Sequence, residues 1–503
     1  MRSTPLFTIL LCAACSSGAG PTSTRSTASP APAGLPGLAF LREAEIRADL
    51  DALASDAMRG REAGTIDELR ASVWVAERAR AAGLEPAGED GTWYQFFPLQ
   101  RQQQSVTSRI AVNGEALQLW RDVAVVGLSS TDVDAPVAWV ASSDEAALAS
   151  AEVTGRVAAV LLDARDAPPA GDALAARRFM NTAVQRIGRT LRDRGAAAVV
   201  VVTDAATDRL FELAATTSMR GRYALDTGEP QAIPATTPTL LVRHAWRDRF
   251  AAPGARFTAR LTVDSFVYPS VNVMGRVRGT DPTLRDEYVL ISAHQDHDGV
   301  RASIEGDSIW NGADDNATVA VAALAIARAF AAQPGRRSAL FVWHGAEEKG
   351  LFGSRWHAER PVVPRESIVA VLNADMIGRN HPDSAALLGV IPPHRNSTAL
   401  AQMALEANAR FAGFALDSTW DRPEHREGWY FRSDHLPYAR LNVPALFFTS
   451  LLHADYHTPR DGPERIDVAK LTRIAKWMYA TGWAVANAAE RPRIDPGFRL
   501  ERE

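Results

Sequence analysis

The pattern of apolar and polar positions changes twice along this chain of 503 residues. Residues 41–103 begin with helical periodicity. Four apolar side chains fall near one face of the first predicted helix: Leu41, Ile46, Leu50 and Leu53. A second helical pattern ends at Gly83, a residue type that suits the C-terminal end of a helix. We therefore expect this first part to be helical.

Residues 104–264 have a different pattern. Short apolar runs such as "RIAV", "VAVVG" and "AAAVVVV" are separated by Gly, Asp and Pro, and one helical stretch, "MNTAVQRIGRTLRDRG", lies among them. Short apolar runs between turn residues are typical of strands. This region is predicted to be a separate β-rich domain with one or two helices.

From residue 265 to 492, predicted strands alternate with predicted helices. The strands are expected at 288–294, 338–344, 368–374 and 444–450, and the helices at about 317–333, 351–359 and 468–490. Apolar strands between helices favour a mainly parallel sheet that is covered on both faces. The fold class is therefore α/β, and residues 493–503 form a tail.

The amino-terminal pattern predicts export. The apolar run from Leu6 to Ala14 is the length of a signal-peptide core and is far shorter than the ~20 residues of a membrane-spanning helix. The ending "LCAAC" resembles a lipoprotein signal. Residues 1–15 are therefore predicted to be a signal peptide of the lipoprotein type, with a lipid attached at Cys15. Residues 16–40 are predicted to be a flexible linker. We expect a periplasmic or outer-membrane-anchored lipoprotein; an ordinary signal peptide and secretion are the alternative.

Composition narrows the chemistry. An apolar fraction of 46%, a charged fraction of 23% and a net charge of -4 describe a globular protein without the basic stripe of a nucleic-acid binder. The only cysteines are Cys12 and Cys15, which excludes thiolate catalysis and cysteine-held zinc in the body of the protein. A metal there needs imidazole and carboxylate ligands.

Such ligands follow the predicted strands. In open α/β sheets, ligands bind beyond the carboxyl ends of the strands. Five segments deliver histidine or carboxylate there: His294 with Asp296, Asp314 with Asp315, Glu347 with Glu348, Asp375, and His457. The recurrence of these residues predicts a site for two zinc ions that share one carboxylate. A Gly-x-Ser-x-Gly motif, which would favour serine catalysis, is missing from the sequence.

Six motifs in this order resemble the co-catalytic zinc aminopeptidase family, whose superfamily includes glutamate carboxypeptidase and glutaminyl cyclases. They are "SAHQD", "GADDNAT", "EEKGLFGS", "LNADMIGR", "SDHLPYA" and "YHTPRD", and the resemblance extends over residues 41–100 and 265–490. It implies the zinc exopeptidase fold. It also implies the following roles: His294 and Asp375 on one zinc, Glu348 and His457 on the other, Asp314 bridging both, Glu347 as general base, and Asp296 orienting His294.

The resemblance carries further expectations. The Asp314–Asp315 bond resembles a cis peptide of the family, and residues 104–264 resemble an inserted protease-associated domain. His297 and Asp298 are expected to lie outside the ligand set. Tyr430 and Tyr456 are both candidates to donate a hydrogen bond to a developing oxyanion, and the sequence does not distinguish them.

We expect an exported zinc-dependent aminopeptidase that acts on peptides and touches the membrane only through a lipid anchor at Cys15. A glutamate-type carboxypeptidase, a glutaminyl cyclase and an inactive receptor-type relative are the alternatives. The sequence leaves open the preferred substrate side chain, the physiological metal and the oligomeric state.

Overall fold

The computed structural model describes residues 34–501, except 164, 166, 170–171, 229–232 and 234–235. The predicted signal, Cys15 and most of the linker lie outside the described residues. From Pro36 onward the chain builds two large sheets.

The larger sheet has ten strands and contains the four strands predicted from the apolar runs. Its order is β19 (Ala415–Leu416), β18 (Ser384–Leu388), β20 (Ala445–Thr449), β17 (Ile368–Ala374), β13 (Tyr288–His294), β16 (Ser338–His344), β12 (Val263–Val277), β2 (Tyr94–Gln104) and β9 (Arg222–Leu225), with β1 (Glu85–Pro86) paired to β12. The central strands β20, β17, β13 and β16 are parallel, as predicted. Strands β12, β2 and β9 are antiparallel, so the sheet as a whole is mixed.

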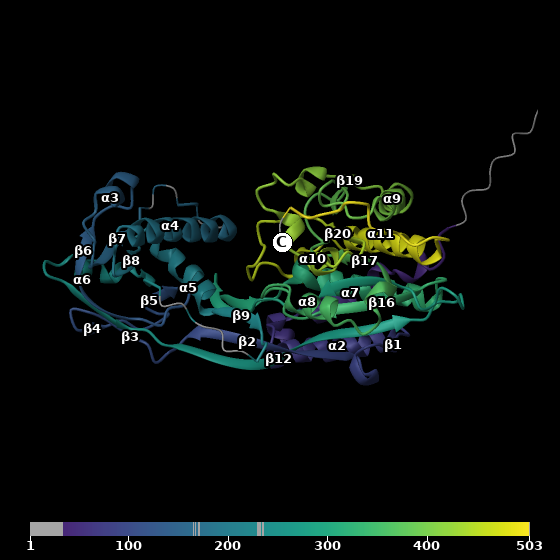
Figure 1. Ribbon diagram of the computed structural model, residues 1–503, viewed down its shortest axis with the longest axis horizontal. Helices are drawn as coiled ribbons and strands as arrows, with labels where there is room; N and C mark the ends of the chain where they lie inside the picture. The colour runs from purple at the N-terminus through teal and green to yellow at the C-terminus, as the bar shows by residue number, and fades with distance from the viewer. Residues whose placement is uncertain are drawn as a thin grey trace, which may run out of the picture. The chain divides into compact units, whose positions relative to one another are not determined.

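Helices cover both faces of this sheet (Figure 1). On one face, α7 (Thr318–Ala332) and α11 (Val468–Asn487) pack with α1 (Glu43–Leu53), while α2 (Ile66–Ala81) packs on β12 and α9 (Thr398–Ala407) on α11. On the other face lie α8 (Phe352–Glu359) and α10 (His435–Arg440). The four residues expected on the buried face of the first helix are all buried.

Helix α7 is apolar except for Thr318 and Arg328, as expected of a helix buried inside a fold. Among the described helices, only the stretch Ala313–Ala332 is long and apolar enough to cross a membrane. However, 83% of its apolar window is buried against the rest of the protein. It is the core helix of the larger sheet.

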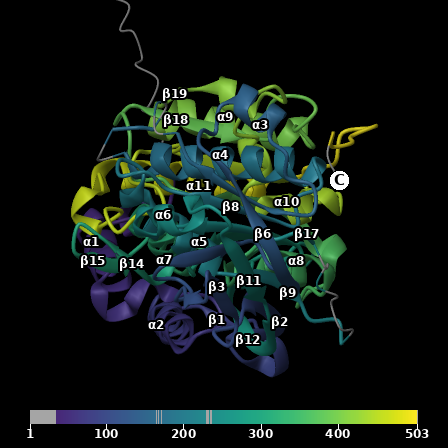
Figure 2. The same cartoon turned by 90° about the vertical axis from the view of Figure 1, so that its left-hand side faces the viewer.

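The second sheet is built within residues 104–264 and faces the viewer in Figure 2. Its order is β4 (Glu115–Ala116), β3 (Arg109–Val112), β11 (Arg256–Arg260), β6 (Asp132–Val140), β7 (Val157–Leu161), β8 (Ala198–Val202), β10 (Thr239–Val242) and β5 (Val123–Val126). Its helices are α3 (Glu145–Ser150), α4 (Ala173–Asp193), α5 (Phe211–Met219) and α6 (Arg247–Ala251). We call this part the inserted lobe; its assignment as a protease-associated domain stays a prediction.

Two long strands join the lobes. Strands β2 and β12 pair over eleven residues, from Tyr94 opposite Val273 to Gln104 opposite Val263. Strand β9 lies within the inserted range of the sequence but pairs with β2 in the larger sheet. The inserted lobe is thus tied to the larger sheet by backbone pairing as well as by its two chain connections.

The loops after the central strands meet at one edge of the larger sheet. The loop after β13 leads into a hairpin of β14 (Gly299–Ile304) and β15 (Asp307–Trp310), and a turn at Ala313–Ala317 opens helix α7. The loop after β20 reaches the inserted lobe, because Arg177 of α4 donates to the carbonyl of Tyr456 over 3.1 Å. The candidate site is built at this edge.

Candidate metal centre

Seven histidine and carboxylate side chains gather at the carboxyl edge of the larger sheet in two groups. The first, called the His457 group, contains His297, Asp315, Glu348 and His457; the second, called the His294 group, contains His294, Glu347 and Asp375. Within each group the potential ligand atoms lie within 4.8 Å of one another. Each group is therefore compact enough to surround one cation.

These side chains come from the ends of several different strands. His294 is the last residue of β13, Glu347 and Glu348 follow β16, and Asp375 follows β17. His457 stands in the loop after β20. This is the edge predicted for a ligand site in an open α/β sheet.

Asp315 lies between the two groups. One of its carboxylate oxygens is 3.4 Å from Nε2 of His294, and the other is 3.0 Å from Nε2 of His457. No other carboxylate among the described residues has recorded contacts with both of these histidines. Asp315 is therefore positioned to be shared by two cations.

The structure corrects the expected role of Asp314. Its carboxylate turns away from both groups and accepts a hydrogen bond from the backbone N–H of Gly378 over 2.6 Å. The cis peptide lies one residue later than expected, between Asp315 and Asn316. Adjacent residues in this turn point in different directions, so the motif "GADDNAT" alone could not say which aspartate faces the site.

His297 belongs to the His457 group, although it was expected to stand outside the ligand set. Its Nδ1 atom lies 2.8 Å from Oε1 of Glu348, and its ring meets the His457 ring edge-on at 5.2 Å between centroids. Asp298 remains outside both groups, with Oδ2 at 3.1 Å from Nδ1 of His457. The Asp298 carboxylate is thus placed to orient the His457 ring.

Asp296 connects the loop after β13 to the loop after β16. Its buried carboxylate accepts the backbone N–H groups of Glu347 and Glu348 at 3.0 and 3.3 Å. Nδ1 of His294 is 3.1 Å from the backbone carbonyl of Asp296 and 3.8 Å from its carboxylate. The Asp296 carboxylate therefore fixes the backbone of the two glutamates, while its predicted role in orienting His294 stays a prediction.

Charge is concentrated in these groups. Burial raises the pKa of the Glu347 carboxyl well above its ordinary value. Burial opposes protonation of His457, but the neighbouring Glu348 carboxylate outweighs it and raises the pKa of His457 to about 10. Buried carboxylates that repel one another are stabilised by cations.

Unsatisfied atoms point to the same conclusion. Several buried ligand atoms have no hydrogen-bond partner among the described residues: Nε2 of His294 and His457, Oε1 of Glu348, and Oδ1 of Asp375. Buried polar atoms are normally paired, and these face one another across the two groups. A donor set of imidazole and carboxylate without sulfur fits zinc or a similar divalent ion.

Residues 272–482, which include both groups, match the model of peptidase family M28. This stretch is an M28 peptidase domain. The curated relatives match over a similar region. A protein of Arthroderma otae named probable leucine aminopeptidase is 28% identical over 226 residues, which is 42% of this chain and 58% of that protein. The uncharacterized protein YfbL of Escherichia coli is 27% identical over 254 residues, 45% of this chain and 75% of that protein.

Solved structures share the fold over most of the chain. An aminopeptidase from Aneurinibacillus sp. strain AM-1 superposes with a TM-score of 0.55 at 17% identity, covering 91% of this chain and 97% of its own. The zinc aminopeptidase BSAP of Bacillus subtilis does so with a TM-score of 0.55 at 15% identity, covering 91% and 99%. At this identity the likeness concerns the fold.

Arg61 supports the M28 centre from beneath and was not singled out from the sequence. Its fully buried guanidinium donates hydrogen bonds to four backbone carbonyls: Gln295 at 2.7 Å, Asn311 at 2.6 Å, Gly312 at 2.9 Å and Leu53 at 3.0 Å. It thereby joins the loop that carries His294 and His297 to the turn that carries Asp315. The resemblance over residues 41–100 includes Arg61 but does not single it out.

The two candidate tyrosines lie in different surroundings. Tyr456 precedes His457, and its hydroxyl accepts a hydrogen bond from Arg432 over 3.1 Å. Tyr430 stacks on His394 with 4.2 Å between ring centroids, and its buried hydroxyl has no hydrogen-bond partner among the described residues. Tyr456 is therefore the tyrosine beside the M28 centre.

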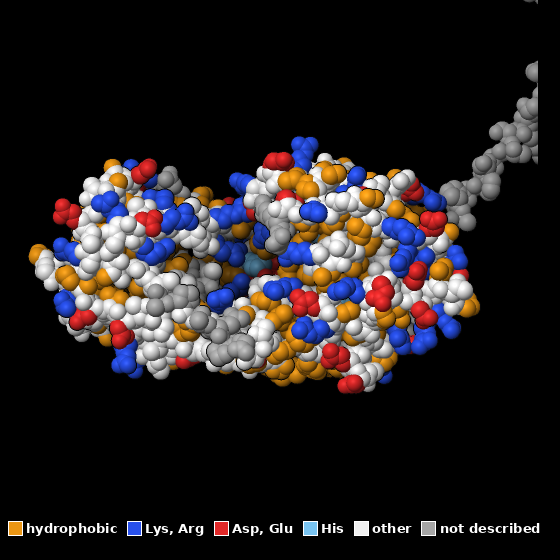
Figure 3. Space-filling model, viewed as in Figure 1, with side chains coloured by type: hydrophobic (Ala, Val, Ile, Leu, Met, Phe, Trp, Pro, Cys, Tyr) orange, Lys and Arg blue, Asp and Glu red, His pale blue; other side chains and the backbone are white. Residues whose placement is uncertain are grey.

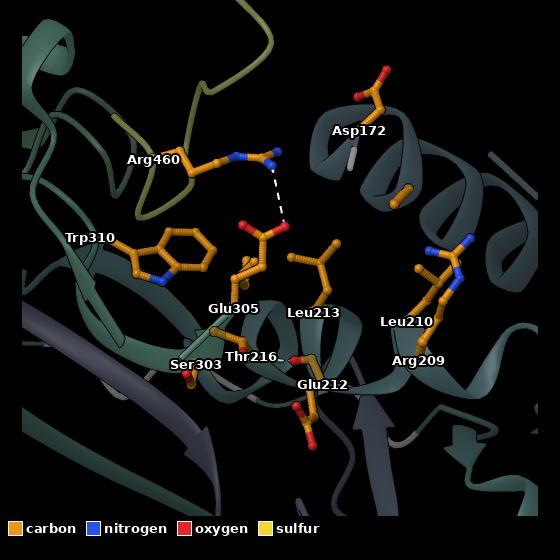
Figure 4. A pocket seen from close by; sticks show the side chains of 12 residues that line it. Asp172, Arg209, Leu210, Glu212, Leu213, Thr216, Ser303, Glu305, Trp310 and Arg460 are labelled. Atoms are coloured by element: carbon orange, nitrogen blue, oxygen red, sulfur yellow. Dashed lines mark hydrogen bonds and ion pairs between the residues drawn. The ribbon is translucent and has the colours of Figure 1, made fainter. Parts of the chain in front are cut away.

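A separate cavity of about 280 Å³ lies between helices α4 and α5 of the inserted lobe and the β14–β15 hairpin (Figure 4). Its wall includes Trp310 and Leu213, and across it Arg460 pairs with Glu305 at 3.5 Å. None of its lining residues belongs to the His457 group or the His294 group. It is not the metal centre.

Proposed function

We propose that this chain is a zinc-dependent exopeptidase that removes amino-terminal residues from peptides. The observation that carries the proposal is the position of Asp315 between two compact ligand groups, with Glu347 at the edge of one of them. This arrangement suits two metal ions that act on one scissile bond.

The ligands divide between two zinc ions as follows. His457, Glu348 and His297 would hold one ion and His294 and Asp375 the other, and the Asp315 carboxylate would be shared between them. The Asp375 carboxylate is held by the Ser433 hydroxyl, which donates to it over 2.9 Å. Bound zinc supplies a Lewis acid for the scissile carbonyl and lowers the pKa of a coordinated water.

Glu347 moves the proton. Its carboxylate lies 3.9 Å from Nε2 of His294, and burial favours its protonated form once it has accepted a proton. It takes the proton from the attacking water and delivers it to the leaving amine. We propose that Tyr456 donates a hydrogen bond to the developing oxyanion.

Two other features support the proposal. Curated relatives are named probable leucine aminopeptidase and, in Pyrenophora tritici-repentis, probable zinc metalloprotease. The complete ligand set also disfavours an inactive receptor-type protein, because loss of ligands would be the simplest route to inactivity.

The experiment is hydrolysis of free and blocked dipeptides by purified, zinc-loaded protein, with zinc measured by elemental analysis. Leu-Gly and its amino-acetylated form are the first pair. We expect cleavage of the free peptide only, with two zinc ions per chain. Cleavage of the acetylated peptide alone would favour a carboxypeptidase, and cyclisation of an amino-terminal glutamine with one zinc would favour a cyclase.

Export remains part of the proposal. The ending "LCAAC" supports a lipid anchor at Cys15. Mass spectrometry of the mature protein should find an acylated cysteine at its amino terminus. An unmodified amino terminus downstream of Cys15 would contradict the anchor.

A further inference from the structure

Basic side chains crowd one side of the M28 centre. Figure 3 shows Lys and Arg side chains on both walls of a hollow in which a histidine is visible. We define the cationic collar as five side chains on the His457 side of the centre: Arg177, Arg220, Arg301, Lys349 and Arg432. Two come from the inserted lobe and three from the M28 domain.

Two arginines flank the stretch Tyr456–His457. Arg177 of helix α4 donates to the backbone carbonyls of Tyr456 and His457 at 3.1 and 3.4 Å. Arg432 donates to the Tyr456 hydroxyl and lies over the Trp429 ring at 4.5 Å. Both side chains are partly exposed, so a substrate can reach them.

Arg177 has spare donors. Both of its recorded hydrogen bonds come from Nη2 and end on backbone carbonyls. Neither Nε nor Nη1 has a recorded acceptor, and Arg177 forms no ion pair among the described residues. An arginine fork with free donors suits a carboxylate that binds through two oxygens.

Three further cations lie beneath these two. Arg301 shares Glu62 with Lys349, at 3.2 and 3.8 Å, and shares Asp298 with Arg220. Nε of Arg301 and Nζ of Lys349 are buried and have no hydrogen-bond partner among the described residues. Burial and the nearby Arg301 lower the pKa of Arg220 to about 10.

The carboxylates recorded with the collar do not balance it. Outside the two ligand groups they are Glu62, Asp298 and Glu427. Asp298 also contacts His457 at 3.1 Å, and Glu427 also pairs with Arg178 at 2.9 Å. Among the described residues, five clustered cations therefore face three carboxylates, two of which also have partners outside the collar, and this leaves an excess of positive charge.

We propose that the cationic collar binds a carboxylate of the substrate next to the scissile bond, so that the enzyme prefers anionic peptides. This inference rests on the proposed exopeptidase function. The carboxylate has two possible sources: the carboxyl terminus of a very short peptide, or an Asp or Glu side chain that follows the cleaved bond. The inserted lobe contributes to this preference for anionic peptides through Arg177.

The test compares matched substrates with zinc-loaded enzyme at low ionic strength. Leu-Gly against Leu-Gly-amide tests the terminal carboxylate, and Leu-Glu-amide against Leu-Gln-amide tests the side chain. We expect roughly tenfold or greater preference in kcat/KM for the charged member of at least one pair, mainly through KM, and a smaller preference in high salt. Equal rates within both pairs would overturn the proposal.

Variants locate the effect. Arg177→Gln and Arg432→Gln should each reduce the preference several-fold, whereas Arg189→Gln should keep it. Arg189 is exposed on the same helix α4, roughly 18 Å from Arg177 at 1.5 Å per residue. A preference that survives both collar variants would also overturn the proposal. Thermal unfolding checks that each variant is folded.

A binding measurement separates this inference from the proposed function. Glutarate is titrated into zinc-loaded wild type and Arg177→Gln by calorimetry, which requires no turnover. We expect about tenfold weaker binding by the variant. Equal affinity would contradict the collar even if peptides are cleaved, and absence of cleavage with an intact difference in binding would contradict only the exopeptidase.

Discussion

The carboxylate of Asp296 accepts a hydrogen bond from the backbone N–H of Glu347 over 3.0 Å. The proposed base is therefore held through its backbone by a side chain from another strand end. Asp296→Asn replaces one acceptor oxygen with a donor that repels the N–H groups it faces. We expect turnover to fall by about 10–100-fold, as for other residues that orient metal ligands. Steady-state kinetics measures this, and an unchanged kcat would contradict the role.

Asp315 and Asp314 should differ sharply. Asp315→Asn removes the shared carboxylate, and we expect loss of tightly bound zinc from both positions. Burial and the nearby Asp461 raise the pKa of Asp314 to about 8, which favours a neutral carboxyl that asparagine resembles, so Asp314→Asn should keep both ions. Elemental analysis after dialysis measures both variants. Retention of both ions by Asp315→Asn, with loss from Asp314→Asn, would restore the expectation from the sequence.

The sequence predicted the loop that carries Asp314 and Asp315, but not which of the two aspartates faces the centre. Apolar runs predicted β13, β16 and β17 with the observed bounds, because buried parallel strands need continuous apolar residues. The strand ends then identified the loops of the centre. Which of two neighbouring aspartates faces inward depends on the backbone conformation of one turn. The pattern of apolar and polar residues does not predict that conformation.

His297 and Arg61 illustrate a second limit. His297 follows His294 by three residues, and only the fold of the loop brings its ring to Glu348. Arg61 donates hydrogen bonds to backbone carbonyls. Because every residue has a backbone carbonyl, the sequence does not show which residues accept these bonds. The pairing of β9 with β2 was likewise hidden, because a four-residue strand within the inserted range gives no sign of its partner.

Arg61→Lys should loosen the centre without touching a ligand. Lysine cannot reproduce a planar fork that serves four carbonyls, so buried acceptors lose their partners. We expect a loss of about 2–4 kcal/mol in the free energy of unfolding, together with weaker zinc binding. Urea denaturation and zinc titration measure these effects. The control is Arg59→Lys, a largely exposed neighbour; equal behaviour of the two variants would contradict the role of Arg61.

His394 should make stability depend on pH. Burial disfavours its charged form, but hydrogen bonds to Asp421 at 3.0 Å and Glu501 at 2.8 Å outweigh this and raise the pKa of His394. A histidine pKa that is higher in the folded than in the unfolded state stabilises the folded protein. This stabilisation is complete at pH values below the unfolded pKa of about 6.5, and it is lost as the pH rises through the folded pKa.

His394→Gln should therefore destabilise more at pH 5.5 than at pH 9, by on the order of 1 kcal/mol. Urea denaturation at both pH values measures the difference. His381→Gln, at an exposed histidine, is the control and should give no such difference. A cost of His394→Gln that does not change with pH would contradict the ion pairs.

The central claim is that Glu347 moves the proton while Glu348 holds metal. Glu347→Gln keeps the shape of the side chain and removes the base, and Glu348→Gln removes a ligand of the His457 group. The most direct measurement is kcat on a free dipeptide with zinc content determined on the same sample. For Glu347→Gln we predict both zinc ions retained, KM nearly unchanged and kcat lower by roughly 10²–10⁴-fold, whereas Glu348→Gln loses zinc first. Near wild-type turnover by fully zinc-loaded Glu347→Gln would contradict the account.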